Sequence, residues 1–166
     1  MMNSLSLELI NSKSPYRVVQ SAEGDFWFVT IHGINYNIAF NEEFEIGGCM
    51  AYQFGIFNHE HQHAPHDPQI KDTIIAIINE FFAKNMDVLL YTCDSSDRRE
   101  KARNRLFIRW FKEEDNGRRF TIRASETSVE GQGMYVAIIV ENCNPHLKEI
   151  TEEFDNTAAV LTSQQK

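Results

Sequence analysis

A continuous apolar run, VLLYTC at residues 88–93, constrains the fold of this chain more than any other feature. A strand with one wet face alternates apolar and polar residues, whereas a strand covered on both faces is apolar throughout. The run therefore predicts a strand in the interior of a sheet. Segments with helical periodicity stand on both sides of it, so we expect helices to cover that sheet.

Three segments predict helices. Residues 67–84 begin with an Asp-Pro pair, an N-cap followed by proline at the first helical position, and their apolar residues fill one arc of a helical wheel. Residues 97–112 begin with a capping box. Residues 144–154 repeat the cap-then-proline start and predict a short last helix.

Strands are predicted where β-branched and aromatic residues alternate with polar ones between turn residues. Besides the apolar run, these are residues 16–20, 26–31, 34–40, 50–57, 120–124 and 134–140, with residues 41–48 left between two strands. The fold class is then α+β, an antiparallel-rich mixed sheet with two long helices packed on it, in the order βββ(β)-α-β-α-ββ-α. We expect a flexible arm over residues 1–14, a single domain over residues 15–155 and a frayed tail over residues 156–166.

The charge of the chain argues against some partners. A net charge of −8 disfavours attraction to nucleic acid or to an anionic membrane. The charge is unevenly spread, because residues 98–123 hold ten Lys and Arg against four Asp and Glu. That window carries +6 and the remaining chain −14, so a basic element lies within an acidic protein.

The second predicted helix carries most of this basic element. On a helical wheel Arg98, Arg105 and Arg109 share an exposed stripe, whereas Arg99 and Arg103 fall in the arc of the apolar residues, which are Ala102, Leu106, Phe107 and Trp110. A guanidinium in that arc keeps its charge and needs a carboxylate, carbonyls or an anionic ligand. Internal ion pairs and a site for an anion or an acidic partner both satisfy this need.

Arg103 gives the sharpest test of this helix. If its guanidinium is partly buried in an ion pair, Arg103→Ala removes one partner and destabilises the fold by ~3–5 kcal/mol. Arg105→Ala, on the exposed stripe, is expected to change stability by less than about 0.5 kcal/mol.

Asp94, Ser95, Ser96 and Asp97 follow the predicted interior strand and precede the second helix. Ligands commonly bind at such strand ends in open α/β sheets, and free helix amides with serine hydroxyls suit a phosphate. Helix capping explains the same residues. Asp94 and Asp97 are therefore candidate binding residues under one of two interpretations.

A histidine-rich segment precedes the first predicted helix. His59, His61 and His63 would point to one side of an extended chain, with His66 close by, and Zn²⁺ or Ni²⁺ binds imidazoles readily. The chain has no CxxC pair to complete such a site. The segment is interpreted as an exposed loop with weak metal binding as the alternative, and no cofactor is predicted.

The expected compartment is the cytoplasm. The three cysteines are far apart, which suits a reducing environment. The first ten residues lack a basic leader, and no apolar run approaches the ~20 residues of a membrane span. We therefore expect neither a signal peptide nor a membrane partner.

The segments DPQIKDTIIAIINEFF (residues 67–82), VLLYTCDSSD (88–97) and ARNRLFIRWF (102–111) resemble a domain-of-unknown-function family of small bacterial proteins. This resemblance covers roughly residues 26–154, implies a bacterial cytoplasmic protein and carries over no catalytic residue. The element order also resembles that of the acetyl-CoA-dependent N-acetyltransferase superfamily, which holds the cofactor pyrophosphate on a Gly-rich turn. Here that turn reads HEHQHAPHDPQI, which departs from the superfamily's pattern at the feature that binds the cofactor.

No acid, base and nucleophile stand together in the sequence. This favours a non-enzymatic binding or regulatory domain that recognises a protein partner or a small anionic ligand through its basic helix. The alternative is an N-acetyltransferase-like enzyme with a degenerate cofactor turn. An aromatic sheet face left uncovered by helices would suit a homodimer.

Overall fold

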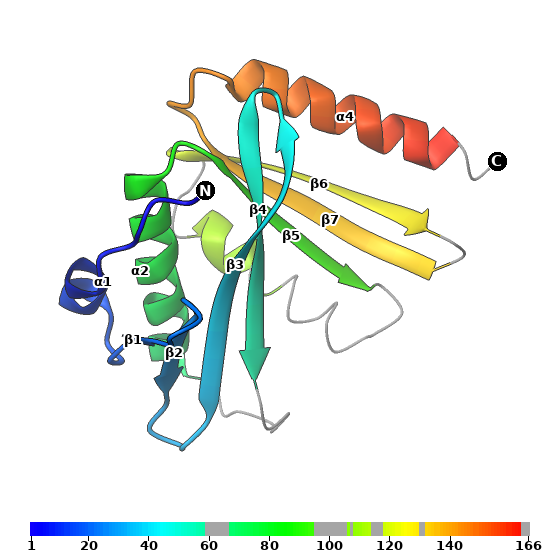
Figure 1. Cartoon of the computed structure of the whole chain (residues 1–166). Coiled ribbons are helices and arrows are strands. Elements are labelled where there is room, and N and C mark those ends of the chain that lie inside the picture. Colours follow the sequence, from blue (N-terminus) through cyan, green and yellow to red (C-terminus); the bar gives the residue numbers. More distant parts are fainter. Residues whose placement is uncertain (59–66, 95–105, 107, 114–117, 130–131, 164–166) are drawn as a thin grey trace. The chain divides into compact units, whose positions relative to one another are not determined.

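A computed structural model of the chain describes residues 1–58, 67–94, 106, 108–113, 118–129 and 132–163. Within these residues the strands are hydrogen-bonded in the order β1-β2-β3-β4-β5-β7-β6 (Figure 1). The strands are β1 (Val19–Gln20), β2 (Phe26–Val29), β3 (Asn35–Ile46), β4 (Cys49–Asn58), β5 (Val88–Asp94), β6 (Phe120–Val129) and β7 (Gln132–Glu141). The helices are α1 (Leu7–Lys13), α2 (Pro68–Lys84) and α4 (Leu147–Ser163), and residues 106 and 108–113 are also helical.

The predicted α+β class is confirmed. Antiparallel pairing joins β1 to β2, β2 to β3, β5 to β7 and β6 to β7, whereas β4 and β5 are parallel. Strand β5, the continuous apolar run, lies between β4 and β7 as predicted for an interior strand. Contacts divide the chain into two compact units, unit 1 (residues 1–41 and 54–85) and unit 2 (residues 42–53 and 86–166), and β3 and β4 contribute to both.

Helix α2 covers the sheet strands of unit 1. Asp67 is its N-cap and accepts a hydrogen bond from the Gln69 amide at 2.9 Å, as the Asp-Pro pair predicts. The Phe81 ring of α2 stacks on Phe40 of β3 with centroids 5.0 Å apart, and Phe40 also contacts Phe54 of β4 at 5.4 Å. This aromatic group joins helix to sheet in the core of unit 1.

Residues 1–14, expected as a flexible arm, contain helix α1, which lies beside α2 (Figure 1). Ser6 is its N-cap, and the Ser6 amide donates to the buried Glu80 carboxylate at 3.1 Å. Ile10 is 1% exposed. Leu5 is also buried, and Asn3 donates hydrogen bonds to Asn85 and to the Lys84 carbonyl. The sequence did not predict this helix because contacts with residues about 75 to 80 positions later in the chain hold the segment.

Tyr16 links the chain after α1 to the start of α2. Its hydroxyl donates a hydrogen bond to the Asp67 carboxylate and accepts one from the Ile31 amide at 3.3 Å. The Tyr16 amide donates to the Thr73 hydroxyl, also at 3.3 Å. Burial, followed by the hydrogen bond to Asp67, raises the pKa of the Tyr16 phenol.

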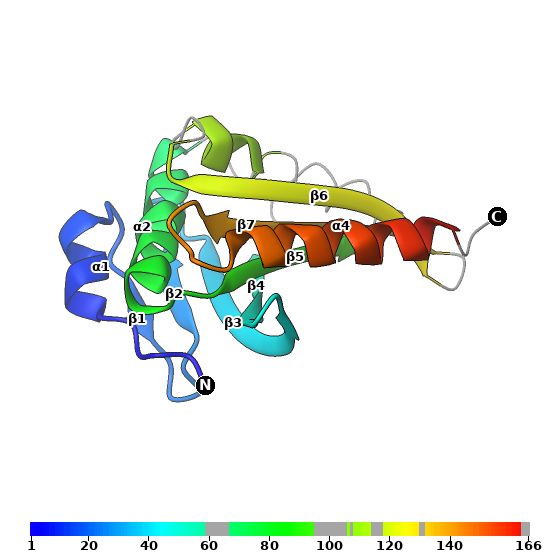
Figure 2. The same cartoon turned by 90° about the horizontal axis from the view of Figure 1, so that it is seen from above.

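In unit 2, helix α4 runs along the hairpin of β6 and β7 (Figure 2). The core beneath it gathers apolar residues of β3, β4, β5, β7 and α4, namely Ile46, Cys49, Ala51, Val88, Leu90, Ile138, Val140, Ile150 and Phe154. The first half of α4 packs on this core through Leu147, Ile150 and Phe154, and the helix continues to Ser163, through residues expected in a frayed tail.

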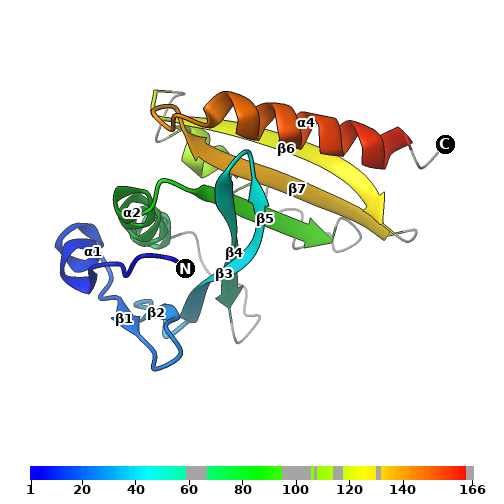
Figure 3. The same ribbon diagram turned by 45° about the horizontal axis from the view of Figure 1, so that its top comes forward.

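The strand predicted over residues 34–40 is longer in the structure. Strand β3 continues to Ile46, and the turn into β4 is made by Gly47 and Gly48 at φ 58° and 89°. The reason is that Phe44 and Ile46 continue the alternation of the strand, so only the two glycines supply the left-handed backbone of a turn. Figure 3 shows this turn beside α4.

Candidate functional site

The described part of the basic segment begins at residue 106 and ends at Arg123. Arg109 has 67% of its side chain exposed and pairs with Glu113, also exposed, with 3.4 Å between Nε and Oε1. Exposed pairs of this kind contribute ~0–1 kcal/mol. The Arg109 guanidinium is therefore on the surface, as predicted, and weakly held.

Two further arginines of the segment meet acidic residues of unit 2. Arg119 lies 3.5 Å from the largely buried Glu141 and stacks over the Phe120 ring at 4.8 Å. Arg123 of β6 lies 3.8 Å from Asp155 of α4. Both arginines are therefore paired with acidic residues of this chain, and their side chains remain about half exposed.

The helical segment buries a different face from the predicted one. Ile108 and Phe111 are 6% and 2% exposed, and the Phe111 ring contacts Phe120 at 4.8 Å. Leu106, predicted in the buried arc, is 41% exposed, so that assignment is wrong. Apolar residues occupy most positions of the sequence LFIRWF, and packing on β6, rather than periodicity, selects the inner face.

The other predicted site residues lie outside the described residues or at their margin. Asp97, Arg98, Arg99, Arg103, Arg105, His59, His61, His63 and His66 are outside them. Asp94 ends β5, where its backbone pairs with Met134, and its side chain is outside the described part. Among the residues that the structure does describe, no group of three or more His, Cys, Asp or Glu is placed to hold a metal ion.

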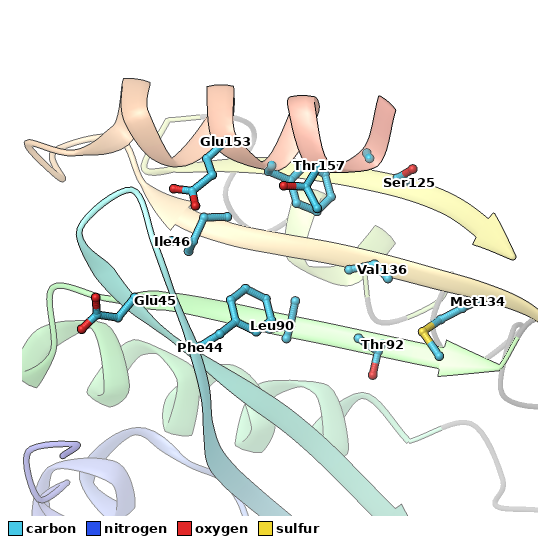
Figure 4. Close-up of a pocket in the computed structure, with 12 residues that line it drawn as sticks. Phe44, Glu45, Ile46, Leu90, Thr92, Ser125, Met134, Val136, Glu153 and Thr157 are labelled. Carbon is cyan, nitrogen blue, oxygen red and sulfur yellow. The ribbon is translucent and has the colours of Figure 1, made fainter. Parts of the chain in front are cut away.

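Unit 2 contains an apolar pocket of about 460 Å³ between α4, the sheet and the turn at the end of β3 (Figure 4). Strand β5 contributes Leu90 and Thr92 to the lining, and strand β7 contributes Met134 and Val136. The two residues of each pair lie on the same face of the sheet because they are two positions apart in their strand. The full lining is Phe44, Glu45, Ile46, Leu90, Thr92, Ser125, Met134, Val136, Glu153, Phe154, Thr157 and Ala158. Its size falls within the ~300–1,000 Å³ of small-molecule sites.

One contact fixes the turn against α4 at the edge of the pocket. The Gly47 amide donates to the Glu153 carboxylate at 2.5 Å. A Cβ at Gly47 would lie 2.5 Å from the backbone nitrogen of Ile150, far inside normal contact distance. Gly47 therefore permits both the left-handed backbone and the close approach that shape this wall.

Cys49 lies near the same turn but has no nucleophilic character. It is 7% exposed, and its sulfur lies 3.8 Å from Nδ2 of the buried Asn144. Burial raises the pKa of the Cys49 thiol, so the thiol stays protonated at neutral pH. Asn144 also accepts from the His146 amide at 2.8 Å, at the predicted cap of the last helix.

Comparison with models of protein families places this chain in one family. A family model described as a family of unknown function, DUF6169, matches residues 66–156, which include α2, β5, β6, β7 and most of α4. The chain belongs to the DUF6169 family. The predicted resemblance to a domain-of-unknown-function family is thereby confirmed. Comparisons of this DUF6169 member with curated proteins and with solved structures returned no match.

No described helix of this DUF6169 protein combines the length and the apolar character needed to cross a membrane. The pocket was not predicted from the sequence, because Thr157 and Ala158 fell in the expected tail and Phe44 and Ile46 between two predicted strands. The signal that could have found it is the spacing of Leu147, Ile150, Phe154, Thr157 and Ala158, which places them on one helix face.

Proposed function

We propose that this DUF6169 protein is a cytoplasmic binding or regulatory domain that recognises an acidic protein partner or a small anionic ligand through its basic segment. The observation that carries the proposal is Arg109, which is 67% exposed and paired only at the surface among its described contacts. A carboxylate or phosphate of the partner can take the place of the Glu113 carboxylate beside Arg109 at a small cost in free energy, because the exposed pair itself contributes ~0–1 kcal/mol.

The sequence supplies the rest of the support. Residues 98–123 carry +6 in a chain of net charge −8, so an anionic partner is attracted to one segment and repelled by the remainder. Such a charge contrast sets the orientation of docking and accelerates association at low salt.

The test is capture of partners from the native cell by the full chain. The variant R105E/R109E reverses two charges in the segment, and K13E/R17E reverses two exposed charges outside it. We expect a bound partner to be lost with R105E/R109E, retained with K13E/R17E and released by salt. Retention by both variants, or no partner with the parent chain, contradicts the proposal.

The arrangement of the elements favours a second candidate, an N-acetyltransferase-like enzyme. Along the described chain, the antiparallel strands β1 to β3 are followed by β4, helix α2, strand β5 parallel to β4, a helical segment and the β6–β7 hairpin. This order resembles that of the superfamily's elements. The sequence HEHQHAPHDPQI still lacks the Gly-rich turn. Element order is analogy, so the chemistry needs its own test.

Thermal denaturation with acetyl-CoA separates the two candidates. A ligand at 100 times its Kd adds ~2.7 kcal/mol to stability. A rise in Tm with acetyl-CoA that ADP at the same concentration does not reproduce supports the enzyme. An unchanged Tm up to millimolar acetyl-CoA contradicts it.

A further inference from the structure

We infer that the apolar pocket of unit 2 binds a small amphiphile with an apolar body and a cationic head. This site is independent of the basic segment: its lining residues come from β3, β5, β6, β7 and α4, and none is basic among the twelve described. The result of a test of this pocket is therefore independent of the proposed function of the basic segment.

The size of the pocket sets the size of the ligand. A cavity of ~150 Å³ holds one benzene molecule, so the volume of about 460 Å³ accommodates roughly 18 non-hydrogen atoms. The walls are apolar at Phe44, Ile46, Leu90, Val136 and Phe154. A hydrocarbon chain or a pair of aromatic rings fits both the volume and the lining.

The polar groups of the lining select the head of the ligand. Glu45 and Glu153 lie at the exposed rim at one end of the pocket; the Glu45 side chain points to the side of β3 opposite to Phe44, and the Glu153 carboxylate accepts the Gly47 amide (Figure 4). Thr92 and Met134 lie toward the other end (Figure 4). Two carboxylates at one end repel a fatty acid or a phosphate ester and attract an ammonium group.

The neighbouring charges support the same choice. Arg123 and Lys148 are the described basic residues nearest in sequence to the lining residues of β6 and α4, and they lie 3.8 Å from Asp155 and 4.0 Å from Glu152. Their positive charge is therefore balanced by carboxylates that do not line the pocket. Among the twelve lining residues the charged ones are Glu45 and Glu153, and both are acidic.

The experiment uses the full chain and N-phenyl-1-naphthylamine, a neutral probe of about this size that fluoresces in apolar surroundings. We expect saturable binding with a Kd on the order of 100 μM or below. Competition below micelle-forming concentrations compares dodecylamine, dodecanol and dodecanoate. Dodecylamine is expected to compete about fivefold better than dodecanol for each ion pair formed, which corresponds to ~1 kcal/mol, and dodecanoate is expected to compete worst.

Variants assign the binding to this pocket. Thr157→Trp places an indole in the pocket and is expected to abolish probe binding, while Asn156→Trp adds the same group at the adjacent exposed position of α4 and leaves binding intact. Ser125→Met fills the pocket from β6 and gives a second test if Thr157→Trp does not fold. E45Q/E153Q keeps an acceptor for the Gly47 amide and is expected to remove the preference for dodecylamine.

Several results would overturn the inference. These are absence of saturable probe binding, probe binding that survives both Thr157→Trp and Ser125→Met, and competition by dodecanoate equal to that by dodecylamine. Loss of binding in both Asn156→Trp and Thr157→Trp with an intact fold would also place the site elsewhere.

Discussion

Replacing Gly47 by alanine tests how the turn after β3 is held against α4. The adjacent Gly48 is the matched control, because it also has a positive φ, 89° against 58°, but a Cβ there meets only the His146 ring at 3.6 Å. Gly48→Ala therefore introduces backbone strain alone. Gly47→Ala introduces strain together with a clash against the backbone of Ile150.

The two contributions give different magnitudes. A left-handed backbone costs an L-residue ~1–2 kcal/mol, which is the whole effect expected at Gly48. At Gly47 the new Cβ would lie 2.5 Å from the Ile150 nitrogen and 2.7 Å from its Cα, where carbon contacts of about 3.5–4.0 Å are normal. The first turn of α4 would have to shift by about 1 Å, and overpacking of this kind adds ~1–3 kcal/mol.

Urea unfolding followed by circular dichroism measures the difference. We expect Gly47→Ala to lose ~2–5 kcal/mol and Gly48→Ala ~1–2 kcal/mol of unfolding free energy. Binding of the fluorescent probe should weaken only in Gly47→Ala, because the shifted helix carries Glu153, Phe154 and Thr157 of the pocket. Equal losses in both variants would refute the contact between turn and helix.

Three further predictions concern titration, reactivity and a buried carboxylate. Because the pKa of the Tyr16 phenol is raised by folding, the phenol contributes stability below its ordinary pKa of about 10, and this contribution is lost as the pH rises through the raised value. Tyr16→Phe should therefore flatten the decline of Tm between about pH 9 and 11. An unchanged slope would contradict this role of Tyr16. Iodoacetamide at pH 8 should label exposed Cys143 quickly and buried Cys49 only on unfolding, as read by peptide mass spectrometry; equal labelling rates would contradict this burial. Glu80→Ala leaves the Ser6 amide without its acceptor and should lower the free energy of unfolding in urea by ~1–3 kcal/mol. The control Lys84→Ala, whose partly exposed side chain lies 4.0 Å from Glu80, should lower it by less than ~1 kcal/mol. Equal losses would show that the ion pair makes the main contribution.

The features that the sequence predicted correctly are local ones. The Asp-Pro pair at residues 67–68 satisfies the first free amides of α2 within three residues of chain, so its effect does not depend on the rest of the fold. The apolar run of β5 needs only that both faces of a strand be covered. Both features act within one element, and periodicity and capping describe single elements well.

The features that the sequence missed depend on contacts between distant residues. Helix α1 is held by a hydrogen bond from Ser6 to Glu80. The inner face of residues 108–113 is fixed by packing of Phe111 on Phe120 of β6. The pocket wall depends on Gly47 approaching Ile150, about a hundred residues later in the chain. A residue pattern within one segment does not identify these distant partners.

The pocket itself follows from the sizes of the side chains along one face of α4. Leu147, Ile150 and Phe154 fill the space above the sheet in the first half of the helix, where the core cluster lies. The same face continues with Thr157 and Ala158, which are too small to reach the strands below, and Ser125 of β6 is equally short. Because interiors normally pack densely, a change from large to small side chains along a straight helix leaves volume at one end. The pocket opens to solvent beside the exposed Phe44 and Thr157, and a ligand that enters it makes contacts that the small side chains at these three positions leave unmade, which is the feature that a bound amphiphile would explain.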